Sequence, residues 1–179
     1  MRIISGKFGG RPIHPPRGLP VRPTTDKMRE ALFNILQAYL EWEQVQVLEL
    51  FCGTAAVSLE CISRGAAGVC CVDQDRRCVA AARKMFQQFG VNNARVVQRR
   101  AEVFIKQCDE AFDFIFMDPP YQLAGQAALI EAILERGLLL PEGILVVEHT
   151  AHLSFEGLPA YSFSRNYGSS SFSFFNIAT

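Results

Sequence analysis

Several signatures of common protein classes are missing from this sequence. No apolar run approaches the roughly 20 residues of a membrane-spanning helix, and the first residues lack the apolar segment of a signal peptide. The six cysteines include no Cys-x-x-Cys pair, so a zinc site is not indicated. His149 and His152 have no third ligand nearby, and we expect both to face solvent. These absences predict a cytoplasmic protein that binds neither metal nor membrane.

The cysteines also do not suggest a disulfide framework. Cys70 and Cys71 are adjacent within an apolar run, so they are expected to point to opposite faces of one strand. A chain of 179 residues, 49% of them hydrophobic, buries enough surface to fold without covalent cross-links. We therefore predict reduced thiols that act as small hydrophobic side chains.

Net charge is absent as well, because 18 basic residues balance 18 acidic ones. That balance alone argues against a nucleic-acid partner, but the distribution is uneven. Residues 1–25 carry five basic side chains and no acid, which leaves 13 basic against 18 acidic residues in 26–179. Such asymmetry is typical of a chain with a polyanionic partner. The alternative is that the basic segment only docks on the acidic remainder.

The chain divides accordingly into a basic N-terminal arm, 1–25, and one domain, 26–179. The first 23 residues hold five of the nine prolines and four of the 13 glycines. They predict a β-hairpin of two short strands, Arg2–Ser5 and Arg11–His14, around a turn at Gly9 and Gly10. We expect this segment to lie outside the hydrophobic core.

The domain shows strands alternating with helices. Thr24, Thr25 and Asp26 are suited to cap a helix whose apolar spacing continues to Leu40. The predicted strands are 45–51, 69–73, 95–98, 112–117 and 144–148, with helices at 57–64, 75–89, from about 101, and 125–136. Strands at 161–165 and 172–177 have no helix between them and must pair antiparallel. This order predicts an α/β class I methyltransferase fold (Rossmann-like), a seven-stranded, mainly parallel sheet with an antiparallel C-terminal hairpin.

The turn after the first predicted strand is suited to bind a nucleoside. Gly53 allows a ligand to approach the backbone, and Asp73 follows 20 residues later, about the spacing at which a carboxylate reaches ribose hydroxyls. A dinucleotide site would need three glycines to seat a pyrophosphate, and Glu49 would repel an anion. S-adenosylmethionine, which has no phosphate and carries an amino group and a sulfonium, fits better. The alternative is that Glu49 and Asp73 are solvated acids at strand ends.

The segment Asp118-Pro119-Pro120-Tyr121 follows the fourth predicted strand. Prolines fix their own φ angles and hold nearby carbonyls in a set orientation. A carboxylate and a carbonyl so placed can accept both hydrogens of an exocyclic amino group, and Tyr121 offers a ring on which a base can stack. These hydrogen bonds would direct the nitrogen lone pair at a methyl sulfonium. An ordinary tight turn is the alternative interpretation.

In these segments the chain resembles the RsmD family, bacterial methyltransferases that modify the exocyclic N2 of a guanine in 16S (small-subunit) ribosomal RNA. The resemblance runs from Arg2 to about Phe175. Its most specific stretches are 2–7, 22–26 with 29–34, and 118–121; Tyr167-Gly168 also matches. It implies that 16S ribosomal RNA or the assembling small subunit is the substrate; we expect the protein to be a monomer.

The resemblance also implies roles for individual residues. Those implied to handle the guanine are Asp118, Pro119, Pro120 and Tyr121. Those implied to bind S-adenosylmethionine are Arg22, Thr24, Thr25, Glu49, Phe51, Gly53, Thr54, Asp73, Ala101 and Glu102. Those implied to contact RNA are Arg2, Lys7, Arg11 and Arg17.

Two residues depart from the family pattern. Ala55 replaces a glycine and is strained if that position needs a positive φ angle. Arg100 replaces an aspartate that often faces the adenine, a role left to Glu102 or to the backbone of Ala101. Two other hypotheses therefore stay open: a DNA adenine-N6 methyltransferase, which uses the same tetrapeptide, and a non-catalytic RNA-binding assembly protein on this fold.

Overall fold

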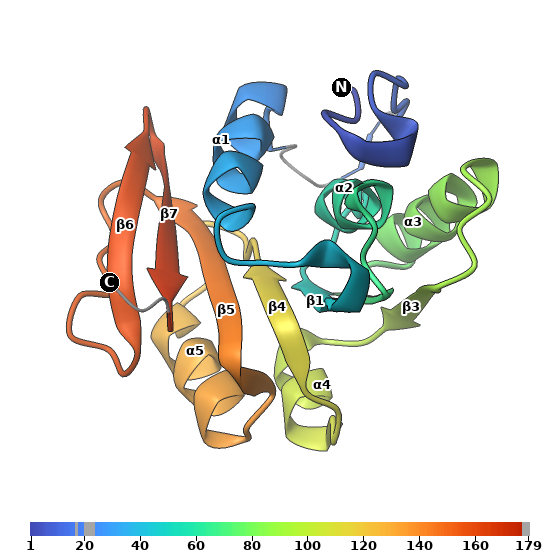
Figure 1. The fold of residues 1–179 in the computed structure, drawn as a ribbon. Coiled ribbons are helices and arrows are strands. Elements are labelled where there is room, and N and C mark those ends of the chain that lie inside the picture. Colours follow the sequence, from blue (N-terminus) through green and yellow to red (C-terminus); the bar gives the residue numbers. More distant parts are fainter. Residues whose placement is uncertain (17, 20–23, 177–179) are drawn as a thin grey trace.

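A seven-stranded sheet forms the centre of the computed structural model, which describes residues 1–16, 18–19 and 24–176 (Figure 1). The strand order is β3-β2-β1-β4-β5-β7-β6. The first five strands in chain order run parallel, and β7 is antiparallel to both β5 and β6. The strands are β1 (Gln46–Leu50), β2 (Gly68–Asp73), β3 (Ala94–Gln98), β4 (Phe112–Met117), β5 (Leu139–Thr150), β6 (Tyr161–Tyr167) and β7 (Ser170–Phe175). The predicted class I fold is confirmed.

Helices cover both faces of the sheet. They are α1 (Asp26–Leu36), α2 (Ala56–Arg64), α3 (Arg76–Gln88), α4 (Ala101–Gln107) and α5 (Gln126–Glu135). The first three helices share one hydrophobic core cluster with the sheet, and α4 and α5 share the other. Cys71 belongs to the first cluster and Cys70 to the second, as alternation along a strand requires. All six cysteines are buried and free, as predicted.

The sheet has its topological switch point at β1, which pairs with β2 on one side and β4 on the other. From β1 the chain continues through β2 to the β3 edge and then returns to β4. The loops after β1 and β4 therefore separate and leave a crevice at the carboxyl ends of these strands, where open α/β sheets bind ligands. No helix among the described residues has both the length and the apolar character needed to cross a membrane.

Some predicted boundaries were wrong, each for a local reason. Helix α1 ends at Leu36, and Tyr39, expected on its apolar face, is exposed. Strand β7 begins at Ser170, where it pairs with Tyr167, so the connection to β6 is a tight turn, not a six-residue loop. Gly168 allows this turn because its φ angle is +66°. The start of β7 was predicted two residues too late because its first residues are serines, although the whole strand is buried.

The N-terminal hairpin is present but short, and the expectation that it lies outside the core was wrong. The Ile3 N–H donates to the Arg11 carbonyl at 3.0 Å and the Ile13 N–H to the Met1 carbonyl at 2.9 Å, on either side of a bridge between Arg2 and Pro12, and a 3-10 helix occupies Gly6–Phe8. Proline has no N–H and cannot continue a ladder. Moreover, Ile3 is 0% exposed and Ile13 only 4%, and both belong to the core cluster. The described part of this segment is therefore docked on the domain, beside α1 and α2 (Figure 1).

Candidate active site

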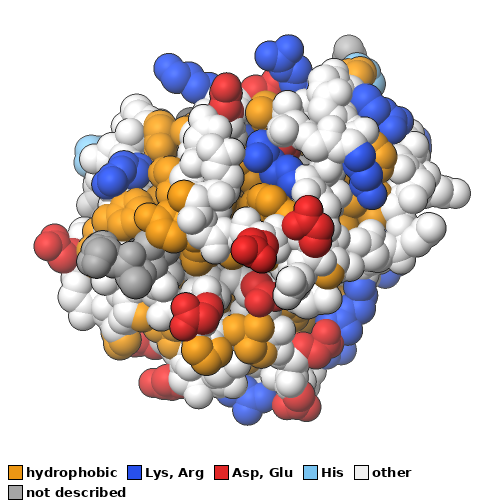
Figure 2. All heavy atoms as spheres, viewed as in Figure 1, with side chains coloured by type: hydrophobic (Ala, Val, Ile, Leu, Met, Phe, Trp, Pro, Cys, Tyr) orange, Lys and Arg blue, Asp and Glu red, His pale blue; other side chains and the backbone are white. Residues whose placement is uncertain are grey.

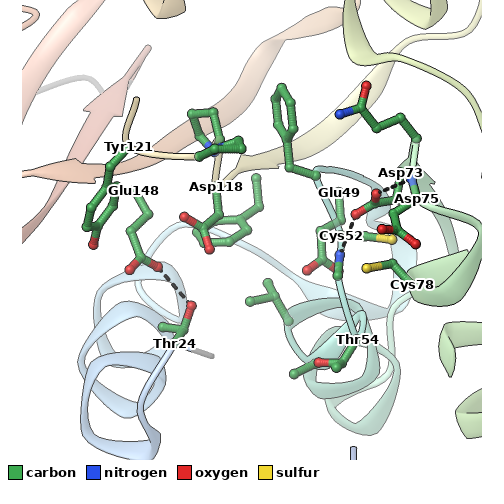
Figure 3. A pocket seen from close by; sticks show the side chains of 18 of the residues that line it. Thr24, Glu49, Cys52, Thr54, Asp73, Asp75, Cys78, Asp118, Tyr121 and Glu148 are labelled. Atoms are coloured by element: carbon green, nitrogen blue, oxygen red, sulfur yellow. Dashed lines mark hydrogen bonds between the residues drawn. The ribbon is translucent and has the colours of Figure 1, made fainter. Parts of the chain in front are cut away.

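A cavity of about 550 Å³ lies at the carboxyl ends of β1, β2, β4 and β5 (Figure 3). This volume is typical of a small-molecule site. Among the described residues, five acidic side chains line it, from Glu49, Asp73, Asp75, Asp118 and Glu148, against one basic side chain, Arg77. Arg77 already donates two hydrogen bonds to the carboxylate of Asp75. The lining therefore suits a cationic ligand and disfavours a phosphate.

The turn after β1 adopts an unusual backbone conformation. Phe51, Gly53 and Ala55 have φ angles of +57°, +51° and +55°, all in the left-handed region. Glycine adopts this region without a steric penalty, whereas the Cβ of alanine costs about 1 kcal/mol or more. Ala55 is fully buried, so its methyl group regains part of that cost through packing. The position therefore does require a positive φ angle, and the alanine is strained.

Asp73, at the end of β2, is held by backbone groups. Its Oδ2 accepts a hydrogen bond from the Gly53 N–H at 2.9 Å, and its Oδ1 accepts one from the Asp75 N–H at 2.8 Å. Each carboxylate oxygen can accept more than one hydrogen bond. Asp73 thus ties the first turn to the second strand and presents acceptors to the cavity at a fixed position.

Glu49 supports the same turn from below. Ala55, the N-cap of α2, has no side-chain acceptor, and the Oε2 of Glu49 instead accepts from the Ser58 N–H at 2.8 Å. A carboxylate at a helix N-terminus is stabilised by the exposed N–H groups and the helix dipole. Burial nevertheless dominates and raises the pKa of the Glu49 carboxyl to about 7, against the lowering effect of its hydrogen bonds to Ser58.

This raised pKa predicts pH-dependent cofactor binding. A cationic ligand favours ionised Glu49, so the affinity for S-adenosylmethionine is expected to rise about tenfold between pH 6 and pH 8 and then to level off. The stability of the fold depends on pH in the opposite direction. A carboxyl whose pKa is raised by folding stabilises the folded state at pH values below its pKa in the unfolded chain, and this stabilisation is lost as the pH rises through 7. The affinity is measured by calorimetric titration at each pH for wild type and for Glu49→Gln. Ionisation of the ligand affects both proteins equally, so the ratio of their affinities reports the effect of Glu49. A slope that is identical in both proteins would contradict the prediction.

The opposite wall of the cavity is formed by the ends of β4 and β5. Met117 pairs with Val147 in parallel register, so Asp118 and Glu148 follow at equivalent positions of neighbouring strands. Met117 and Val147 face the α4–α5 layer, and alternation directs the next residues to the opposite face. Both side chains accordingly reach the same cavity, where Figure 3 shows them together with Glu49.

Tyr121 is oriented by a contact from the C-terminal hairpin. Its hydroxyl forms a hydrogen bond of 2.6 Å with the Oγ of Ser170, a buried residue at the start of β7. The carbonyl of Pro120 accepts from the Leu123 N–H at 2.8 Å, which closes the turn behind the ring. The Tyr121 ring therefore lies at the cavity with its hydroxyl held by Ser170 and its backbone held by the turn.

The structure brings most of the predicted site residues into one cavity. Those that line it are Thr24, Glu49, Phe51, Gly53, Thr54, Asp73, Asp118, Pro119, Pro120 and Tyr121. Three others lie elsewhere: Thr25 caps α1, Ala101 is buried at the start of α4, and Glu102 pairs with Arg100 at 3.5 Å. Arg22 lies outside the described residues.

Sequence reasoning missed several lining residues, above all Glu148, together with Met1, Cys52, Asp75 and Cys78. Glu148 had a detectable signal, because an acid ends a strand of otherwise apolar residues. The expectation for His149 was wrong: it is buried, and its two ring nitrogens are hydrogen-bonded to the Thr150 carbonyl and the Ser173 hydroxyl. Within the described ranges, no group of three or more His, Cys, Asp or Glu residues could hold a metal ion.

Comparison with known proteins gives consistent matches over most of the chain. The family described as Conserved hypothetical protein 95 matches residues 1–176. Ribosomal RNA small subunit methyltransferase D of Escherichia coli (strain K12) is 33% identical over 160 residues, covering 89% of this chain and 80% of that protein. Putative rRNA methyltransferase YlbH of Bacillus subtilis is 32% identical over 153 residues, covering 83% and 82%.

Solved structures agree with these matches. The putative methyltransferase yhhF from Escherichia coli superposes with a TM-score of 0.87 and 31% identity, over 98% of this chain and 96% of that one. The Thermus thermophilus 16S rRNA N2 G1207 methyltransferase, solved with AdoMet and guanosine, has a TM-score of 0.70 at 24% identity, over 88% of this chain and 45% of that chain. At that identity the match shows the fold alone.

Proposed function

Because this chain belongs to the RsmD family, described as Conserved hypothetical protein 95, we propose that it methylates the exocyclic N2 amino group of a guanine in 16S ribosomal RNA. It is an S-adenosylmethionine-dependent methyltransferase with the class I fold. The observation that carries the proposal is a single cavity in which the Asp118–Tyr121 turn faces Glu49 and Asp73. One wall suits an amino-bearing base, and the other suits a cationic nucleoside.

The described residues fit S-adenosylmethionine through the chemistry of their donors and acceptors. When bound, the cofactor supplies a methyl group made electrophilic by its sulfonium. Asp73 offers fixed carboxylate oxygens for the ribose, and Gly53 allows close approach of the ligand to the backbone. Asp118 accepts one hydrogen of the guanine amino group and directs its lone pair, and Tyr121 stacks on the base. Transfer of that methyl group to the amino nitrogen would displace one proton, which Asp118 or water would take.

We also propose that the N-terminal segment contacts RNA. Its attachment to the domain uses the buried side chains of Ile3 and Ile13, a contact of Arg11 with the Phe89 ring, and backbone groups: the Ile4 and Ser5 N–H groups donate to Glu60 at 2.7 and 3.0 Å. The side chains of Arg2, Lys7 and Arg11 remain exposed. Figure 2 shows Lys and Arg side chains gathered over the upper part of the molecule, where Figure 1 places this segment and α1. Arg17 lies outside the described residues.

Removing two of these cations is expected to flatten the salt dependence of RNA binding. Each lost phosphate contact reduces the slope of log K against log salt by roughly 0.7–0.9. The variant Lys7→Ala/Arg11→Ala should therefore lose up to about two units of slope, measured by filter binding of small-subunit RNA from 50 to 300 mM salt. Lys106→Ala, exposed at the end of α4, is the matched control. An unchanged slope in the double variant would remove the segment from the interface.

One experiment tests the proposed function against both alternatives. Purified protein and labelled S-adenosylmethionine are incubated with small-subunit RNA, with isolated small subunits and with duplex DNA, and methylated bases are mapped by mass spectrometry. We expect N2-methylguanine at one position in RNA or in subunits. Transfer to adenine in duplex DNA would support the DNA methyltransferase. RNA binding without cofactor binding in calorimetry would support the non-catalytic assembly protein.

A further inference from the structure

Glu148 is a cavity residue for which neither the family resemblance nor the comparisons suggest a role. Only 4% of it is exposed, and it lines the cavity beyond the last paired residues of β4 and β5. The Thr24 hydroxyl donates to its Oε2 at 2.8 Å. A buried carboxylate is costly unless hydrogen bonds or a ligand compensate it. Together with Asp118 it presents two neighbouring carboxylates to the cavity, an arrangement that suits a ligand with several hydrogen-bond donors as its partner.

Guanine provides such a partner on its Watson–Crick edge. The N1–H and the two hydrogens of the N2 amino group form an uninterrupted row of donors along that edge. An enzyme that acts on a base taken out of its stack reads this edge by hydrogen bonds. Two carboxylates on adjacent parallel strands lie close enough together for one base edge to contact both. Asp118 at the amino group leaves the neighbouring N1–H for Glu148.

We propose that Glu148 is the specificity-determining residue of this site and accepts a hydrogen bond from the N1–H of the target guanine. The proposal rests on the proposed function. Adenine presents an unprotonated N1 beside its amino group, so its lone pair would face the carboxylate and be repelled. The hydrogen bond from Thr24 fixes the rotamer of Glu148 and reduces the cost of its burial. The residue thereby selects guanine over other amino-bearing bases.

The test uses a base that keeps the reacting group and loses only the neighbouring contacts. 2-Aminopurine carries the same 2-amino group, but its N1 is an acceptor. Once the target guanine has been mapped, small-subunit RNA is ligated around a synthetic oligonucleotide holding guanine or 2-aminopurine at that position. The two RNAs then compete for the enzyme, and the ratio of methylation rates is measured.

Wild-type protein is expected to prefer guanine by roughly 10- to 100-fold, the discrimination that a good polar contact to a base provides. In Glu148→Gln the side-chain amide can donate to the unprotonated N1 of 2-aminopurine. The preference should therefore fall by about tenfold or more, while the affinity for S-adenosylmethionine stays within about twofold. Glu142→Gln, exposed at the other end of β5, is the matched control.

Three results would overturn the proposal. A wild-type preference near one means that no group reads N1–H, and this result needs no variant. An equal loss on both RNAs in Glu148→Gln means that the residue is only structural. Rates and a preference in Glu148→Gln that equal those of wild type assign the reading of N1–H to another group. Absence of guanine methylation by wild type would instead refute the proposed function, so the two failures are distinguishable.

Discussion

Replacing Asp118 by asparagine is expected to slow methyl transfer by about 100- to 1,000-fold and to leave the affinity for S-adenosylmethionine within about twofold. An amide of the same size keeps one acceptor but introduces an N–H group that faces the hydrogens of the guanine amino group. It also removes the base that takes the displaced proton. Because Asp118 lies on the wall opposite Gly53 and Asp73, the cofactor contacts stay in place.

The measurement is a single-turnover rate with saturating cofactor, combined with calorimetry for cofactor affinity. Asp113→Asn is the matched control, because Asp113 lies at the other end of β4 and accepts from the Gln46 N–H at 2.8 Å. That variant loses a surface contact and should keep the rate within about twofold. Full activity in Asp118→Asn, or a loss of rate explained entirely by weaker cofactor binding, would refute the role given to Asp118.

The sequence predicts this part of the site because the relevant chemistry is local. Asp118 is followed directly by the prolines that shape its turn, Gly53 lies in the turn after a recognisable apolar strand, and Asp73 ends the next strand. Strand order brings these ends together, and strand order follows from the alternation of helices and strands. Glu148 is harder to find, since its role depends on the register between β4 and β5.

The attachment of the N-terminal segment could not be predicted from sequence. Arg29 looks like a surface residue of an amphipathic helix, yet its side chain is completely buried. Its burial depends on Glu60, which belongs to a different helix and is also completely buried. Periodicity identifies apolar faces and does not detect two opposite charges buried against each other. Because the docking of the N-terminal segment on Glu60 was not visible in the sequence, Ile3 and Ile13 were interpreted as isolated apolar residues of an exposed arm.

Replacing Glu60 by glutamine is expected to reduce the free energy of unfolding by about 3–5 kcal/mol, the largest stability effect that we predict. Glu60 accepts from the Ile4 and Ser5 N–H groups and from the Arg64 Nε at 2.9 Å, and it lies 3.9 Å from the Arg29 Nη1. Loss of its charge leaves the buried guanidinium with one ion-pair partner among the described residues, Asp26, at 2.6 Å. Urea unfolding measures the loss, and Glu30→Gln, exposed on α1, is the control.

A double variant distinguishes the contribution of the Arg29 and Glu60 charges to stability from the contribution of the volume of these two side chains. Two buried N–H groups of Arg29, at Nε and Nη1, have no hydrogen-bond partner among the described residues, so the guanidinium is costly as soon as Glu60 is gone. Replacing a buried ion pair by apolar residues of similar volume is often neutral. Arg29→Met/Glu60→Leu should therefore lose less stability than Glu60→Gln alone, although the Ile4 and Ser5 amides lose their acceptor and should exchange hydrogen faster. The loss of unfolding free energy in the double variant could instead equal the sum of the losses in Arg29→Met and Glu60→Leu. The two charges would then not be coupled, and Glu60 would stabilise the N-terminal segment through backbone hydrogen bonds alone.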